Sequence, residues 1–304
     1  MRRAVKRAAE LVLTRSGMAA AGRLLHRRAP LILAYHNVVP DDAAPCGERA
    51  LHVRRSDFAR HLDILGQHRE VVPLAELWTD EGAGPPRAAV TFDDAYLGAV
   101  TLGVEEVVKR GMAATIFACP GLLGGTAFWW DQLAGGFGGA IPVGIRERAL
   151  RELGGRQQDV LEWAEGEGMS LDEVGPHGRS ATLQELRRAT SLPRIDVASH
   201  TWSHPNLTAL DADELEAELE RPTAWLERTL DRPVPWVSYP FGLECETVRS
   251  MARSHYGAGL RVDGGFAPRQ APDPGSDARF CLPRLNIPAG LSFDNFELRI
   301  SGIV

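Results

Sequence analysis

Short apolar runs recur along the chain from residue 31 onward and alternate with segments of helical periodicity. The runs are four to six residues long and mostly apolar, as expected for buried strands. The segments between them place apolar residues three or four positions apart, which is the repeat of an amphipathic helix. This alternation predicts an α/β fold with parallel strands. The predicted strands are residues 31–35, 88–92, 113–118, 195–198 and 236–239, with weaker candidates at 71–72 and 258–260.

Capping residues mark several of the predicted helices. Ser56 precedes one apolar helical repeat, and a valine-rich face covers residues 100–108. Asp211 and Glu214 have the spacing of a capping box at the start of a long helix. Pro222 lies inside that helix and predicts a kink or a split into two helices, because proline removes a backbone hydrogen bond.

The alternation breaks between about residues 121 and 192. This interval begins glycine-rich, continues as a charged helical stretch at 145–166, and returns to a capped helix at Thr182. A long excursion between two strands is usually an elaboration on one rim of the fold. The adjacent Trp129 and Trp130 near its start suit either stacking on a sugar ring or packing in the core.

Charge is distributed unevenly along the 304 residues. Residues 1–30 contain eight basic residues and one acidic residue, which leaves a net −13 on the rest of a chain whose total is −6. We therefore predict a basic N-terminal helical segment at 1–29 and a single domain at 30–304. The segment suits either a helix docked on the domain with a solvated basic face or one lying on an anionic membrane surface. Nucleic acid is not an expected partner, because the acidic remainder would repel phosphate.

The sequence contains no clear membrane-spanning segment, signal peptide or cysteine motif. No run approaches the roughly 18–20 apolar residues of a membrane-spanning helix, and Arg15 interrupts the apolar block at 11–13, which argues against a signal peptide. We therefore expect a cytoplasmic protein, either free or associated with the inner face of the membrane. The four cysteines lie far apart without a Cys-x-x-Cys pair, which favours free thiols over a thiolate metal site.

Two adjacent carboxylates, Asp93 and Asp94, directly follow the predicted strand at 88–92. Neighbouring side chains of a strand point in opposite directions, so the backbone must turn there to bring both acids into one cleft. Two carboxylates at close quarters repel each other unless a cation or a proton lies between them. A metal ion would relieve that repulsion.

His200 and His204 follow another predicted strand and can complete such a site. Their i, i+4 spacing predicts that they lie on one face of a single helical turn. Two imidazoles and one carboxylate make a three-ligand metal site that leaves room for water and substrate. Because the carboxyl ends of parallel strands gather at one edge of the sheet, the acid pair and the histidine pair are expected to meet there.

These residues resemble motifs of the polysaccharide deacetylases with a NodB-like domain (carbohydrate esterase family 4). The family's Thr-Phe-Asp-Asp-Gly motif is similar to residues 91–95, where alanine replaces glycine, and its His-x-x-x-His-Pro motif matches 200–205. Its Arg-x-Pro-Tyr/Phe-Gly motif resembles 238–242, where serine replaces arginine. The resemblance covers about 30–304. It implies a distorted (β/α) barrel of about seven parallel strands, elaborated here by an insertion and an N-terminal helix.

The resemblance also implies a role for each matching residue. Asp93 would be the general base. Asp94, His200 and His204 would bind a divalent metal ion, for which zinc is the favoured candidate, although such ligands also hold cobalt, nickel or iron. The backbone N–H of Phe241 would help to stabilise the oxyanion.

Two family positions are filled differently in this chain. The family's late Leu-x-His motif is missing, since no histidine follows His255. His36 resembles instead the Tyr-His motif of permuted members, in which that histidine takes the place of the general acid. Ser238 stands where the base-orienting arginine is common, and Arg284 is the candidate to reach in from another strand. The alternatives are a structural His36 that bonds neighbouring loops and a surface Arg284.

The function predicted from this resemblance is hydrolysis, with a metal ion, of the N-acetyl group of an amino sugar. The carbohydrate would be a polysaccharide, a lipid-linked intermediate or a smaller glycan. One alternative is an esterase or amidase that acts on a non-sugar substrate, because fold does not fix substrate. Another is a catalytically weak glycan-binding module.

Overall fold

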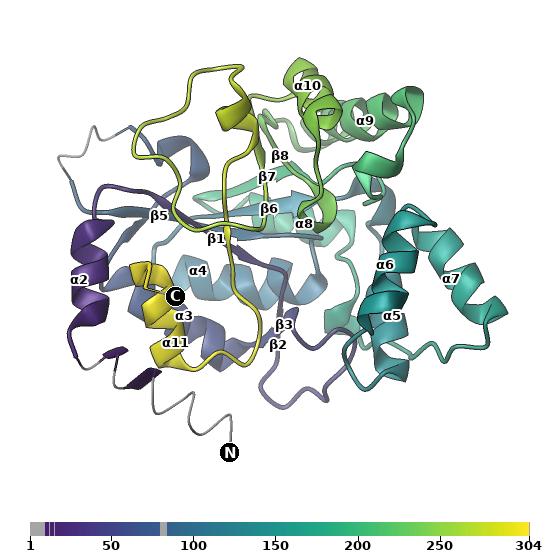
Figure 1. Ribbon diagram of the computed structural model, residues 1–304, viewed down its shortest axis with the longest axis horizontal. Helices are drawn as coiled ribbons and strands as arrows, with labels where there is room; N and C mark the ends of the chain where they lie inside the picture. Colours follow the sequence, from purple (N-terminus) through teal and green to yellow (C-terminus); the bar gives the residue numbers. More distant parts are fainter. Residues whose placement is uncertain (1–9, 12, 15, 80–83, 304) are drawn as a thin grey trace.

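The computed structural model describes residues 10–303 of the chain, except for residues 12, 15 and 80–83. The described chain folds around one curled sheet of parallel strands, and helices cover the outside of that sheet (Figure 1). This architecture confirms the predicted distorted (β/α) barrel.

The described strands form two parallel sheets and are β1 (Leu31–Tyr35), β2 (Asn37–Val39), β3 (His52–Arg54), β4 (Glu70–Val71), β5 (Arg87–Phe92), β6 (Ala114–Ala118), β7 (Ile195–Ser199), β8 (Trp236–Ser238), β9 (Ala258–Leu260) and β10 (Leu285–Asn286). The main sheet has the order β10–β1–β5–β6–β7–β8–β9, and β4 pairs with the start of β5. The second sheet contains β2 and β3.

A short segment at residues 282–286 closes the barrel. On one side, Leu282 donates its N–H to the carbonyl of Gly259 in β9 at 3.0 Å. On the other side, Leu285 in β10 pairs with Leu33 of β1. This closure brings residues near the end of the chain beside the first strand, and it therefore places residue 284 inside the ring.

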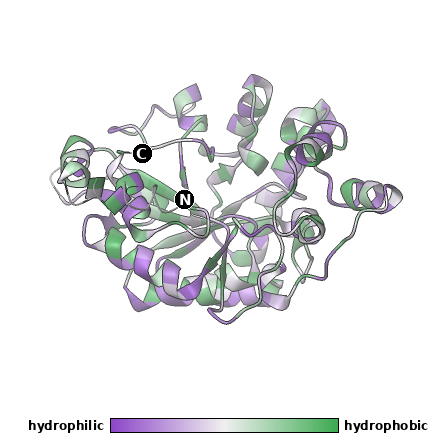
Figure 2. Cartoon of the chain, turned by 60° about the horizontal axis from the view of Figure 1, so that its bottom comes forward, coloured by the Kyte–Doolittle hydropathy of each residue, from purple (hydrophilic) through white to green (hydrophobic). Residues whose placement is uncertain are grey.

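The helices that surround the sheet in the described chain are α2 (Met18–Leu25), α3 (Arg55–Gly66), α4 (Val104–Lys109), α5 (Trp129–Gly136), α6 (Val143–Arg151), α7 (Gln157–Gly166), α8 (Leu183–Thr190), α9 (Ala212–Leu230), α10 (Glu246–His255) and α11 (Phe293–Ser301). Hydrophobic residues follow the strands, and the helices combine hydrophobic with hydrophilic positions (Figure 2). This distribution is typical of helices that bury one face on a sheet.

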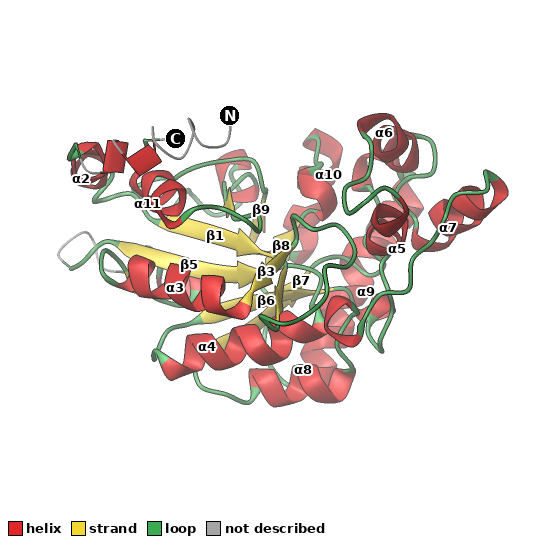
Figure 3. Cartoon of the chain, turned by 90° about the horizontal axis from the view of Figure 1, so that it is seen from below, coloured by secondary structure: helices red, strands yellow, loops and turns green. Residues whose placement is uncertain are grey.

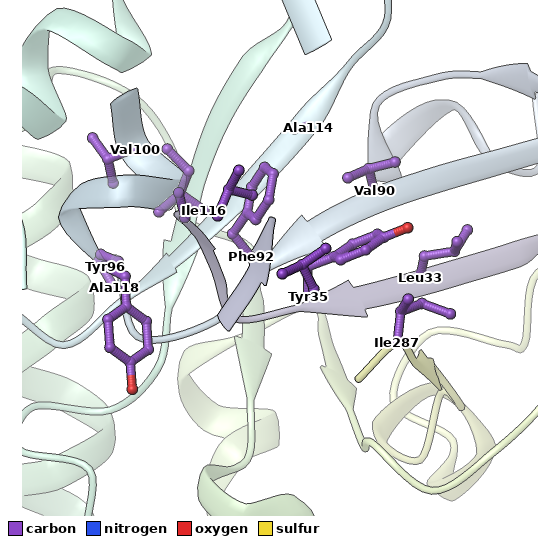
Figure 4. Close-up of a cluster of buried hydrophobic side chains, with 14 of the residues drawn as sticks. Leu33, Tyr35, Val90, Phe92, Tyr96, Val100, Ala114, Ile116, Ala118 and Ile287 are labelled. Atoms are coloured by element: carbon purple, nitrogen blue, oxygen red, sulfur yellow. The ribbon is translucent and has the colours of Figure 1, made fainter. Parts of the chain in front are cut away.

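Alternate strand residues belong to two different hydrophobic clusters. Leu33 and Val90 lie in the larger cluster, which includes residues of the surrounding helices (Figure 4). Ile32 and Ala89 point the other way and lie in a separate cluster with Phe117. Both faces of these strands are therefore buried, which explains why they are apolar almost throughout.

All seven strands predicted from the sequence are present, with ends that differ by at most one residue. The sequence analysis did not predict β2, β3 or β10. These strands have three, three and two residues, which is too short to show a two-residue hydrophobic period.

The structure excludes one of the two effects predicted for Pro222, the split into two helices. Helix α9 runs as one helix of 19 residues across Pro222, so the proline does not split it. The expected capping box is present, since the Asp211 carboxylate accepts a hydrogen bond from the N–H of Glu214 at 2.9 Å. Leu219, Pro222 and Leu226 are all buried, and this packing offsets the lost backbone hydrogen bond.

Two other predicted helices differ in detail. The helical stretch expected at 145–166 is divided into α6 and α7, because Gly154 and Gly155 between them have φ values of +61° and +63°. Such left-handed conformations end a helix. Ser56 lies in the first turn of α3 and is not its N-cap; its hydroxyl donates to Asp41 at 2.7 Å.

The additions to the barrel lie at opposite ends of its strands. Helices α5, α6 and α7, from the 121–192 excursion, lie beyond the carboxyl ends, whereas α2 and α11 lie near the amino ends (Figure 3). Helix α8, from the same excursion, lies against β7. The division into segments 1–29 and 30–304 stays a prediction, and part of the first segment lies outside the described residues.

All four cysteines lie in the described part of the chain and are free, as expected. Among the described helices, none has the length and the apolar character that crossing a bilayer would require.

We expect Gly259→Ala to destabilise the barrel. A Cβ atom at this position of β9 would lie 2.6 Å from Cζ of Tyr239, whose ring is buried and whose hydroxyl donates to the carbonyl of Phe280. Overpacking of this kind costs about 1–3 kcal/mol. The control is Gly257→Ala, where the nearest atom is the carbonyl oxygen of Pro235 at 3.4 Å. Thermal unfolding of both variants should show a lower midpoint only for Gly259→Ala, and equal midpoints would contradict this account.

Candidate active site

Asp93 and Asp94 lie at the carboxyl end of β5, and both are buried. The backbone turns sharply there, since Asp94 has a φ of 68° and the following Ala95 a φ of 51°. This left-handed conformation is uncommon for residues with a Cβ atom and explains why glycine suits the position that Ala95 occupies. The turn aims the two neighbouring carboxylates at the same edge of the sheet.

Asp94 lies beside both predicted histidines. Its Oδ1 atom is 3.4 Å from Nε2 of His200 and 3.2 Å from Nε2 of His204, and the two Nε2 atoms are 3.2 Å apart. One ligand atom from each of the three residues can therefore surround a single ion. The structure brings together the three residues that the sequence analysis predicted as metal ligands.

The histidines reach this position without a helix, which corrects the expected helical turn. Residues 200–204 form a loop in which Thr201 has a φ of 68° and His204 a φ of 61°. The loop bends both rings toward Asp94, so the i, i+4 spacing is right but the local conformation inferred from it is wrong.

The hydrogen bonding of this cluster fits a divalent ion. Nδ1 of His200 lies 2.8 Å from the carbonyl oxygen of Ser238, so it donates its proton there and leaves the lone pair of Nε2 directed at the cluster. Oδ1 of Asp94 is buried and has no hydrogen-bond partner among the described residues. A buried carboxylate oxygen without a donor is well suited to a cation.

The electrostatics of His200 and Asp94 also favour positive charge at this place. Burial alone would lower the pKa of His200, but the nearby Asp93 and Asp94 outweigh burial and raise that pKa. Burial raises the pKa of Asp94, but His204 and His200 outweigh it, so the pKa lies well below its usual range. The Asp94 carboxylate is therefore ionised at neutral pH.

Asp93 has a different partner, Arg284 from the closing segment. Nη1 and Nη2 of Arg284 each donate to one carboxylate oxygen of Asp93 at 2.7 Å. Such a two-bond pair fixes the orientation of the carboxylate as well as its charge. Burial raises the pKa of Asp93, but Arg284 followed by His200 lowers it below its ordinary value. The structure therefore places Arg284 at the site and not on the surface.

Ser238 leaves room for Arg284 and bonds to it. Its hydroxyl accepts a hydrogen bond from Nη2 of Arg284 at 2.6 Å, while Nη1 also donates to Thr91 at 3.1 Å. The guanidinium carbon lies 5.3 Å from the centre of the Phe117 ring. The serine that replaces the family's usual arginine thus contacts an arginine supplied from elsewhere in the chain.

His36 lies directly after β1, in line with Asp93. The two strands pair in register through Tyr35 and Phe92, and the N–H of Asp93 donates to the carbonyl of Tyr35 at 2.9 Å. His36 is partly exposed. Its pKa is lowered by burial, although Asp94 and Asp93 act in the opposite direction.

Aromatic rings form one wall of the site. The ring centres of Phe241 and Trp130 lie 4.6 Å and 4.8 Å from that of His204. Phe241 is partly exposed and has a left-handed φ of 58°. Trp129 is fully buried and Trp130 nearly so, so this pair packs in the core and offers no open surface for stacking on a sugar.

A buried hydrogen-bond network behind this wall was not predicted. The fully buried Asp131 carboxylate accepts bonds from the Tyr96 hydroxyl at 2.6 Å and from the N–H of Glu48 at 2.8 Å, and it lies 3.0 Å from Nε2 of His52. The indole N–H of Trp130 in turn donates to Tyr96 at 2.7 Å. The network fixes Trp130 against His204. In the sequence, the position of Asp131 directly after two tryptophans indicated a buried acid. No feature of the sequence near His52 indicated that this histidine would contact it.

Comparison with known proteins places this geometry in a family. A family model described as polysaccharide deacetylase matches residues 80–257, which is more than half of the chain. That region contains Asp93, Asp94, His200 and His204. No curated protein matches the chain in sequence.

Solved structures share the fold. The deacetylase PplD of Streptococcus pyogenes, solved with acetate, has a TM-score of 0.59 at 17% identity and covers 90% of this chain and 98% of its own. A polysaccharide deacetylase from Bacillus cereus has a TM-score of 0.64 at 17% identity, with 90% and 69% covered. A de-N-acetylase from Aggregatibacter actinomycetemcomitans has a TM-score of 0.59 at 14% identity, with 88% and 98% covered.

At sequence identities of 14–17%, the solved structures establish only the fold. Membership of the family rests on the match to the family model. Because that model spans more than half of the chain and contains both the acid pair and the histidine pair, the chain belongs to the polysaccharide deacetylase family of hydrolases.

Proposed function

We propose that this protein uses a divalent metal ion to remove the N-acetyl group from an amino sugar of a glycan. The observation that carries this proposal is the division of labour between the neighbouring acids. Asp94 faces two imidazole nitrogens with an oxygen that lacks a donor, while both oxygens of Asp93 are held by Arg284. Asp94 thus suits a cation. Asp93 is paired with Arg284 and can act as a base.

Asp94, His200 and His204 would hold the ion. When bound, it would polarise the acetyl carbonyl and lower the pKa of water toward about 7. Asp93 then accepts the proton of the attacking water as general base. Arg284 keeps this base ionised and orients it, because its two hydrogen bonds leave the carboxylate little freedom to rotate.

The negative oxygen that forms during attack needs a donor, and the leaving amine needs a proton. The backbone N–H of Phe241 serves the oxygen in this proposal, supported by the position of its ring against His204. His36 delivers the proton to the amine. Support for His36 comes from its place directly after β1, in line with Asp93 across the paired strands.

An N-acetylated carbohydrate is the substrate class that the family supports best. PplD is named a deacetylase and was solved in complex with acetate, and the relative from Aggregatibacter actinomycetemcomitans is named a de-N-acetylase. Acetate release from a panel of polymeric, lipid-linked and short N-acetylated glycans, with acetyl esters alongside, would decide which carbohydrate this protein uses.

Asp93→Asn should abolish turnover but keep the metal. The amide can still bond to Arg284 but cannot take a proton, so acetate release should fall about 100- to 10,000-fold. His200→Ala should lose both activity and bound metal, because it removes a ligand. Acetate release and metal content measured on the same samples test this, and full activity of Asp93→Asn would refute the proposed base.

Removing Arg284 should shift the pH profile of activity. In Arg284→Met, burial raises the pKa of Asp93 and only the nearby histidines still oppose it, so that pKa should rise. Since activity is lost as the base becomes protonated, the acid limb should move to higher pH. The variant should also be less stable by about 3–5 kcal/mol, because a buried charge loses its partner.

Arg284→Lys serves as a second variant that keeps the charge. It should fold and show a smaller shift, because it loses the paired geometry but not the cation. An acid limb that stays in place in both variants would mean that Arg284 acts only on stability.

The loss of activity in His36→Gln should depend on whether the leaving group needs a proton. A sugar amine needs a proton to depart, whereas nitrophenolate from nitrophenyl acetate does not. We therefore expect about a 100-fold loss or more on the N-acetyl substrate and little change on the ester. His255→Gln, a change on α10, is the control. Equal losses on both substrates would contradict the role of His36 as general acid.

A further inference from the structure

Helix α2 buries small residues against the domain and exposes its large apolar residues to solvent. Its small residues Ala19 and Gly22 are buried, and Gly22 lies against the end of α11. Arg23 on the same side pairs with Glu297 of α11 at 2.6 Å. Leu24 and Leu25 face outward and are 68% and 67% exposed. An isolated domain would gain stability by burying those leucines instead.

The exposed apolar residues are concentrated near this helix. Four of the nine large hydrophobic side chains exposed in the described chain lie between residues 11 and 25, namely Leu11, Met18, Leu24 and Leu25. Single exposed leucines are ordinary, but a local group of them marks a surface that contacts something apolar.

Arginines lie beside the carboxyl-terminal end of this helix. A hollow of about 1200 Å³ opens beside the end of α2, and four arginines line it, namely Arg27, Arg28, Arg87 and Arg269. Arg27, Arg28 and Arg269 are exposed, and no carboxylate is among the lining residues in the described part of the chain. Trp78 also lines the hollow, and tryptophan favours the boundary between membrane and water.

The charge of the whole chain supports the same partner. Residues 11–30 contain no acidic residue, whereas the chain after residue 30 carries a net −13. Near an anionic surface, the acidic body would be repelled and the basic end attracted. The protein would therefore approach such a surface with α2 in front.

We propose that this N-terminal face (Met18, Leu24, Leu25, Arg27, Arg28 and Arg269) docks on an anionic phospholipid bilayer. The leucines enter the boundary region of the lipids, and the arginines pair with lipid phosphates. The proposal does not depend on the reaction that the site performs.

Docking in this way fixes the orientation of the active site. The hollow lies where β1 and β5 begin, since Pro30 and Arg87 line it, whereas His36 and Asp93 follow the ends of the same strands. Strands of this length span roughly 20 Å. The docking face and the residues of the candidate active site are thus at opposite ends of the barrel.

The test is sedimentation of the full chain with lipid vesicles. The protein should sediment with vesicles of phosphatidylcholine mixed with phosphatidylglycerol and remain in solution with phosphatidylcholine alone. Salt should weaken binding. Arg27→Gln/Arg28→Gln should bind about thirty-fold more weakly, from roughly 1 kcal/mol for each arginine. Leu24→Ser/Leu25→Ser should lose about ten-fold or more.

Matched variants elsewhere on the surface provide the controls. Arg151→Gln/Arg188→Gln removes the same charge from exposed positions on α6 and α8, and Val143→Ser removes an exposed apolar side chain. Both should bind vesicles like the unaltered chain. All variants should keep their thermal midpoint and their acetate release from a water-soluble substrate.

Three results would overturn the proposal. The unaltered chain could ignore anionic vesicles, or the control variants could lose as much binding as the arginine pair. Alternatively, light scattering could show that Leu24→Ser/Leu25→Ser converts a dimer into a monomer, in which case a second copy covers this face and not a bilayer.

Discussion

The buried ion pair between Arg284 and Asp93 links the closing segment of the barrel to the strand that carries both acids. Its two hydrogen bonds of 2.7 Å cross 191 positions of sequence. Losing one partner of a buried pair costs about 3–5 kcal/mol, so neither group can be removed without affecting the other. The pair joins the residue before β10 to the residue after β5, so closure of the ring and the charge of one carboxylate depend on each other.

Two adjacent ionised carboxylates remain compatible with burial here because each has its own source of positive charge. Arg284 serves Asp93, and the imidazole side of the site serves Asp94. The left-handed backbone at Asp94 allows this separation, because an extended strand would send the two side chains to opposite faces. The same turn explains why the family favours a glycine next to the acids, a place that Ala95 fills here.

How much the sequence could reveal depended on whether a feature was local. Strands buried on both faces were predictable because five apolar residues in a row carry a signal, whereas the two residues of β10 carry none. The spacing of His200 and His204 correctly indicated neighbours, but loop residues can achieve that proximity as well as a helix. The continuity of α9 through Pro222 and the contact of Asp131 with His52 depend on tertiary packing, which no local pattern encodes. Arg284 was named only by resemblance to the family.

The order of the parts along the chain has a consequence for synthesis on the ribosome. The region matched by the family model ends at residue 257, before the closing segment has been made. A nascent chain of that length already contains Asp93, Asp94 and both histidines. It lacks Arg284, whose guanidinium stabilises the buried charge of Asp93. Until the last strand arrives, that carboxylate must stay hydrated or take up a proton. Under the proposed mechanism, the general base would therefore be completed only late in the biogenesis of the protein.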